Sequence, residues 1–166
     1  MKLFQKTVLI GLTIGLGACG YQPLYGTSAT GSRVTSQLSS VVVEPQNTRT
    51  GQLIRNEVLS SIGNNDSKNS MYRLAFTSSA NDENTVKTFG SDTLRKSYQL
   101  NVKYTLANTS NGKIVHKGNT FAHVSYDKTA APFSDYQAQI SAQERAAKEV
   151  GNDIRTRLAA YFATKQ

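Results

Sequence analysis

The first residues that could do chemistry are a serine, a lysine and two histidines. Ser110-Asn111-Gly112-Lys113 has the Ser-x-x-Lys spacing of some acyl-transferring enzymes. That motif requires its serine at the start of a helix in a buried cleft, whereas Asn-Gly is a strong signal for a hairpin turn. His116 and His123 are seven residues apart on a predicted strand, which places them on opposite faces unless a bulge intervenes. We therefore expect neither a catalytic nor a metal site here.

Other signatures of catalysis are missing from the sequence. It contains no Gly-x-Ser-x-Gly, no His-Glu-x-x-His and no phosphate-cradling glycine loop. Asp82 and Glu83 are adjacent on a predicted loop, and adjacency alone does not make an acid/base pair. We expect a protein that is not an enzyme and has no cofactor, with an undetected hydrolase as an alternative.

Cys19 is the only cysteine of the chain, so an intramolecular disulfide is excluded. Lys2 and Lys6 precede an apolar run of about 11 residues, which is typical of a secretory signal and too short to span a ~30 Å hydrocarbon layer. The run ends in Leu16-Gly17-Ala18-Cys19, which resembles the bacterial lipobox. There the thiol accepts a diacylglyceryl group before the peptidase cuts.

The lipobox predicts how the chain is organised. Residues 1–18 should be a signal peptide that is removed, and Cys19 should carry the acyl chains, palmitate among them. Residues 19–37 are rich in Gly, Ser and Thr and should be a tether. Residues 38–166 should form a single domain. Gly20, which is not acidic, predicts an anchor in the outer membrane that faces the periplasm.

The chain is basic, with a formal net charge of +8, of which the signal contributes Lys2 and Lys6. A basic periplasmic protein suits an anionic partner such as lipid phosphate, and its location disfavours nucleic acid. Ordinary solubility explains a charge of this size equally well.

Hydrophobic periodicity predicts an α+β domain of order β-α-β-β-β-α. A Val-Val-Val strand lies within 38–44, and a helix over 50–62 begins at a threonine cap and ends at Gly63. Strands follow at 72–77, at 98–106 and after the Asn-Gly turn. A long helix from Ser134 or Asp135 to about Thr164 ends the chain. These elements predict a mixed four-stranded sheet with two helices packed on one face.

The register of the last hairpin is ambiguous. A two-residue type I′ turn at Asn111-Gly112 would pair Val102 with Phe121 and Thr105 with Gly118. However, Ile114, Ala122, Val124 and Tyr126 have the opposite parity to Val115 and Phe121. A bulge near Gly118 could reconcile them.

The last helix carries an apolar stripe that should face the sheet, and a coiled coil or a membrane-lying helix would carry the same pattern. The stripe consists of Tyr136, Ile140, Ala147, Val150, Ile154, Leu158 and Tyr161.

Several segments together resemble a known family. They are the opening Cys19-Gly-Tyr-Gln-Pro-Leu-Tyr-Gly26, Arg49 to Glu57, Leu94 to Thr109, Ser125-Tyr-Asp127 and Glu144 to Phe162. The chain is similar to the LptE-type lipopolysaccharide-assembly lipoproteins, in their α-proteobacterial branch. The resemblance implies a non-enzymatic role inside the outer-membrane barrel LptD, which such proteins plug and help to assemble. It also implies binding of lipopolysaccharide during delivery to the outer leaflet.

Lipid A carries phosphates, so basic side chains are candidate binding residues. Arg95 and Lys103 should project from the uncovered face of the sheet, and Lys113 should stand at the turn tip. Lys96 has inward parity, but its long stem can carry the ammonium to water. Solvated lysines that blunt an exposed sheet are the alternative. The alternative function is a structural or adaptor lipoprotein of another envelope transport complex that does not bind lipopolysaccharide.

Overall fold

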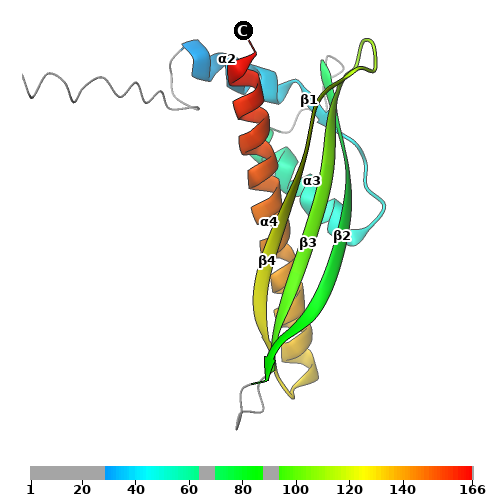
Figure 1. Ribbon diagram of the computed structural model, residues 1–166, viewed down its shortest axis with the longest axis vertical. Helices are drawn as coiled ribbons and strands as arrows, with labels where there is room; N and C mark the ends of the chain where they lie inside the picture. Colours follow the sequence, from blue (N-terminus) through cyan, green and yellow to red (C-terminus); the bar gives the residue numbers. More distant parts are fainter. Residues whose placement is uncertain (1–28, 64–69, 88–93, 166) are drawn as a thin grey trace, which may run out of the picture.

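The computed structural model describes residues 29–63, 70–87 and 94–165 (Figure 1). The order of elements is α2 (Ala29–Ser39), β1 (Val41–Val43), α3 (Arg49–Ile62), β2 (Tyr72–Lys87), β3 (Leu94–Asn108), β4 (Ile114–Lys128) and α4 (Pro132–Thr164). The predicted α+β class is confirmed, with three helices in place of two over the residues that the structure describes. The signal peptide, Cys19 and Gly20 lie outside the described residues.

The strands form one mixed sheet in the order β1-β2-β3-β4. β1 is parallel to β2 and pairs with the first three residues of β2. Val41 lies opposite Tyr72, and Val43 lies opposite Leu74. β2, β3 and β4 are long antiparallel neighbours. β2 runs well past the predicted end at residue 77, so Asp82 and Glu83 lie on a strand and not on a loop. In Figure 1 the helices lie on one side of the sheet, and α4 follows β4 along its length.

Apolar residues at alternate positions of β3 form much of the core. Tyr98, Leu100, Val102, Tyr104 and Leu106 are all buried toward the helices. The stripe on α4 meets them as predicted, because Val150, Ile154 and Leu158 are fully buried. No helix among the described residues is long and apolar enough to cross a membrane.

The start of α4 differs from the prediction. The helix begins at Pro132 after the cap residue Ala131, and Asp135 falls in its first turn. Proline suits this position because its missing N–H would have no helical partner. Tyr136 does not face the core, since 55% of it is exposed. Tyr136 belongs to the first turns of α4, which Figure 1 shows beside the ends of the strands.

Helix α3 follows the prediction closely. The Thr48 hydroxyl accepts a hydrogen bond from the Gly51 amide at 3.1 Å, and Gly63 ends the helix with a φ of 86°. Ile54, Val58 and Ile62 form its buried face. This face packs against α4.

The prediction that a tether extends to residue 37 is wrong for the residues that form helix α2. Residues 29–37 belong to a helix, and Val34 and Leu38, one turn apart, are both buried in the core. Two large apolar residues suffice to bury one face of a short helix against α4, although the remaining residues are small and polar.

The last hairpin also differs. Residues 109–113 connect the strands, and among the described residues only glycines have positive φ, so Asn111 excludes a type I′ turn. Val102 pairs with Thr120 and Tyr104 with Gly118. The irregularity lies between Leu106 and Ala107, opposite Val115, and not at Gly118.

Candidate functional site

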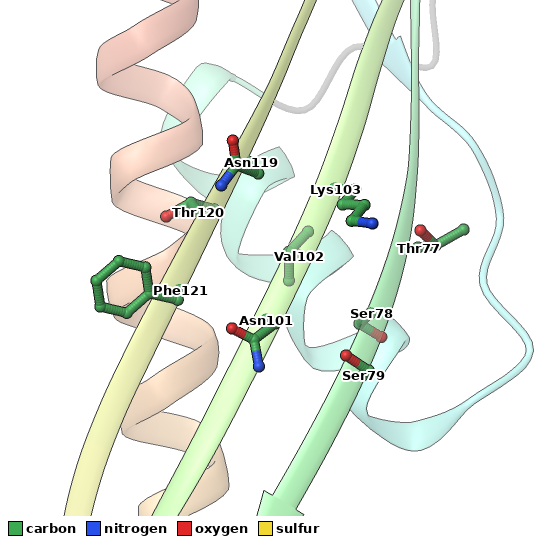
Figure 2. A pocket seen from close by; sticks show the side chains of 9 residues that line it. All are labelled: Thr77, Ser78, Ser79, Asn101, Val102, Lys103, Asn119, Thr120 and Phe121. Carbon is green, nitrogen blue, oxygen red and sulfur yellow. The ribbon is translucent and has the colours of Figure 1, made fainter.

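The uncovered face of the sheet carries a shallow hollow of about 440 Å³, which we call the polar groove (Figure 2). Two rows of cross-strand partners form it: Thr77, Lys103 and Asn119 in one row, and Ser79, Asn101 and Phe121 in the next. Ser78, Val102 and Thr120 complete the lining. The register positions this site, because each row takes one residue from each of three strands.

Hydroxyl and amide groups dominate the polar groove, with one ammonium group and one aromatic ring. In Figure 2 Lys103 extends toward Thr77 of β2, and Phe121 stands on β4 at the other side. The Phe121 ring is 62% exposed and meets His123 edge to face at 5.6 Å between centroids. Such a surface can donate hydrogen bonds to sugar or phosphate oxygens and can stack against an apolar face.

The structure does not bring the four predicted cations together. Arg95 and Lys103 do project from the uncovered face, but eight residues of strand separate them by about 26 Å. Lys113 lies in the exposed turn after β3. Lys96 is half-buried near the beginning of β3, at the opposite end of the strand from that turn. Only Lys103 lines the polar groove.

Arg95 also has a partner within the sheet. It lies opposite Asp127 on β4, and its Nε donates to Asp127 Oδ1 at 3.1 Å. Both side chains are more than half exposed, so the pair contributes little to stability. It nevertheless reduces the positive charge that Arg95 offers to an anion.

The histidines lie on opposite faces, as their spacing predicts. His123 is on the uncovered face, whereas His116 faces α4 and its ring stacks on Tyr161 at 5.0 Å between centroids. The Tyr104 hydroxyl lies 3.4 Å from His116 Nε2. Burial, and then the charge of Arg157, lower the pKa of His116. Burial is also the main cause that raises the pKa of Tyr104.

This aromatic cluster of Tyr104, His116 and Tyr161 was not predicted from the sequence. Its residues come from β3, β4 and α4, and together with Lys117, Gly118, Arg157, Ala160 and Thr164 they line a cavity of about 350 Å³. The available signal was Gly118, a glycine inside a strand, which marks a close approach of another group. A Cβ there would lie 2.5 Å from the Tyr104 hydroxyl oxygen.

A second missed cluster lies toward the other end of the sheet. Asp82 on β2 accepts hydrogen bonds from the Tyr126 hydroxyl at 3.3 Å and from Gln139 Nε2 at 2.9 Å. Burial, with the charge and hydrogen bond of Asp82, raises the pKa of Tyr126 to about 12. The cluster ties β2, β4 and α4 together and is structural in character.

Neither Ser110 nor the potential metal ligands of the described residues lie in a built site. Ser110 lies in the exposed hairpin turn, where its amide donates to Asn108 Oδ1 at 2.9 Å. Within residues 29–63, 70–87 and 94–165, no three His, Cys, Asp or Glu side chains gather as metal ligands.

Comparison with known proteins identifies the fold. No family model and no curated sequence matches the chain. Among solved structures, it is similar to a candidate lipoprotein from Caulobacter crescentus CB15, with a TM-score of 0.69, 28% identity, and coverage of 81% of this chain and 98% of that one. It also resembles a minor lipoprotein from Acinetobacter baumannii (TM-score 0.54, 12% identity, coverage 72% and 88%). A third similar structure is rare lipoprotein B from Shewanella oneidensis (TM-score 0.52, 10% identity, coverage 72% and 92%).

The fold is therefore one that bacterial lipoproteins share. The two more distant structures establish the architecture alone, because their sequence identities are low. The Caulobacter protein extends the likeness to the sequence over nearly its whole length.

Proposed function

We propose that this chain is an outer-membrane lipoprotein of the LptE type. In this proposal it plugs the barrel LptD, supports assembly of the barrel, and binds lipopolysaccharide during delivery to the outer leaflet. The observation that carries the proposal is the likeness to the Caulobacter candidate lipoprotein, which covers 98% of that chain. The lipobox at Cys19 and the sequence segments described above support the same conclusion.

The proposed role is non-enzymatic. The polar groove presents hydroxyls, amides and Lys103 on an open sheet face, which suits phosphate and sugar groups of a large amphiphile. Basic side chains would compete with the divalent cations that bind lipopolysaccharide molecules to each other.

The spread of the cations favours a second candidate function. Because Arg95 is paired with Asp127 and lies far from Lys103, these residues do not form one patch. An adaptor lipoprotein of another envelope transport complex, without lipopolysaccharide binding, fits that arrangement.

Two measurements separate these functions. Purification of the full chain in mild detergent should bring along a barrel of roughly 26 strands. The combined Arg95→Glu, Lys103→Glu, Lys113→Glu variant should lose lipopolysaccharide binding at low salt and still associate with the barrel. Lys148→Glu, on the exposed side of α4, is the matched control and should bind normally. If the triple variant binds as tightly as the wild type, the adaptor function is the better account.

A further inference from the structure

The outer edge of β4 has unpaired backbone groups. β4 is the last strand of the sheet, and the Ser125 carbonyl accepts a hydrogen bond from Arg145 Nη2 on α4 at 3.4 Å. The backbone groups of Ser125 therefore point away from β3. Since this direction alternates along an antiparallel strand, Asn119, Phe121 and His123 also direct their N–H and C=O groups outward. The described hydrogen bonds include none from this edge at those three residues.

This edge also lacks the usual protection against strand addition. Edge strands commonly carry a charge, a proline or a bulge that blocks pairing with another chain. The stretch from Gly118 to Tyr126 contains no Lys, Arg, Asp, Glu or Pro. Lys117 and the irregularity at Val115 lie before it, and Asp127 follows it. Seven of these residues, Gly118 to Val124, or about 23 Å of strand, precede the Ser125 carbonyl that Arg145 occupies and are open to pairing.

A groove runs beside this edge, between β4 and α4. It consists of a cavity of about 510 Å³, lined by residues 119–121 with Glu149, Asp153 and Arg157, and the cavity at His116 described above. The two cavities share Arg157. An added strand would lie against β4 and would direct alternate side chains into this groove.

The spacing of the α4 side chains matches such a strand. Glu149, Asp153 and Arg157 are four residues apart, which is about 6 Å per step along a helix. Two residues of a strand span about 6.6 Å, so successive helix-facing side chains of an added strand would meet successive α4 side chains. Asp153 pairs with Arg157 at 2.7 Å, whereas Glu149 has no ion pair among the described residues. Arg157, which lines both cavities, supplies a positive charge at the other end of the groove.

We propose that β4 binds an extended segment of another protein, which adds to the sheet as a fifth strand. Its helix-facing side carries a basic residue over Glu149 and an acidic residue over Arg157. The site is separate from the polar groove and the partner is a polypeptide, so the inference goes beyond the proposed function. A second copy of this chain fits less well, because pairing β4 with itself would bring two α4 helices to the same seam (Figure 1).

Synthetic peptides test this site on the purified full chain. The probes are fluorescent nine-residue peptides rich in threonine and valine, with a lysine and a glutamate four residues apart in either order. One of the two orders should bind, as measured by anisotropy, and that order gives the direction of the added strand. A peptide with glutamate at both positions should bind about fivefold more weakly. Methylation of alternate backbone amides should abolish binding, because pairing to β4 requires them.

A charge reversal on α4 provides the matched variants. Glu149→Lys should weaken binding of the lysine–glutamate peptide about fivefold and favour the peptide with two glutamates. Glu144→Lys, an exposed reversal on the same helix outside the groove, should change neither.

The proposal is overturned if neither order binds, if N-methylation has no effect, or if both charge reversals act equally. It is also overturned if the chain sediments as a dimer that Asn119→Lys dissociates, since a second copy would then occupy the edge. None of these results depends on lipopolysaccharide or on a barrel, so the proposed function stands or fails separately.

Discussion

At the scale of single residues, the pairing of Gly118 with Tyr104 determines the chemistry beside α4. The absence of a side chain at Gly118 leaves room for the Tyr104 ring, whose hydroxyl oxygen would otherwise lie 2.5 Å from a Cβ. The ring can then reach His116 from beneath β4. A slip of one residue would place Lys117 or Asn119 opposite Tyr104 and would send every side chain of β4 to the wrong face.

The depressed pKa of His116 predicts a pH dependence of stability. Because burial and Arg157 disfavour its charged form, the unfolded chain binds more protons than the folded one in mildly acidic solution. The stabilisation is complete above a pH of about 6.5 and is lost as the pH falls through the folded-state pKa. We expect His116→Gln to show a smaller drop in urea midpoint between pH 7.5 and pH 5 than the wild type. His123→Gln, an exposed control, should keep the full drop. Equal drops in the wild type and His116→Gln would contradict the assignment.

At the scale of elements, the sequence predicts what depends on local patterns. β3 is evident from alternation, and α3 from its cap and period, because both signals lie within the element itself. The hairpin at Asn111-Gly112 is confirmed, but its turn is not of type I′, because Asn-Gly permits more than one turn. Here Asn108 Oδ1 accepts a hydrogen bond from the Ser110 amide, and Asn111 Oδ1 accepts one from the Lys113 amide. These hydrogen bonds stabilise a connection longer than a two-residue turn. The resulting bulge turns Phe121 outward.

Helix α2 was missed because its composition is that of a linker and only its position against α4 makes it part of the domain. That position predicts a cost for Leu38→Ala, since Leu38 is 3% exposed. We expect a loss of about 2–4 kcal/mol in the free energy of unfolding, measured by urea denaturation. Ser36→Ala on the exposed face of the same helix should cost less than about 0.5 kcal/mol. An unchanged stability in Leu38→Ala would mean that this segment behaves as a tether after all.

At the scale of the whole molecule, the candidate site could be predicted only in part. Parity alone places Arg95 and Lys103 on the uncovered face. It does not indicate that they lie about 26 Å apart, or that Thr77, Asn119 and Phe121 join Lys103, because those facts depend on the register of three strands. α2, the tip of the β3–β4 hairpin and the C-terminus gather at one end of the molecule (Figure 1). Cys19 precedes Ala29 by ten residues, which span at most about 35 Å, so a lipid there would hold this end near the membrane.

The anchor is the prediction on which the location of the molecule depends. Cys19→Ser should abolish incorporation of radioactive fatty acid, because a hydroxyl cannot replace the thiol that becomes the thioether. The folded domain should be unaffected, since residues 29–165 contain the core, and its thermal midpoint should equal that of the wild type. Gly20→Asp is the matched control: it keeps the acyl acceptor, so it should be labelled normally while fractionating with the inner membrane. Equal labelling of Cys19→Ser and the wild type would contradict the prediction that Cys19 carries a lipid anchor. In that case the proposed position of the domain beside an outer-membrane barrel would lose its physical basis.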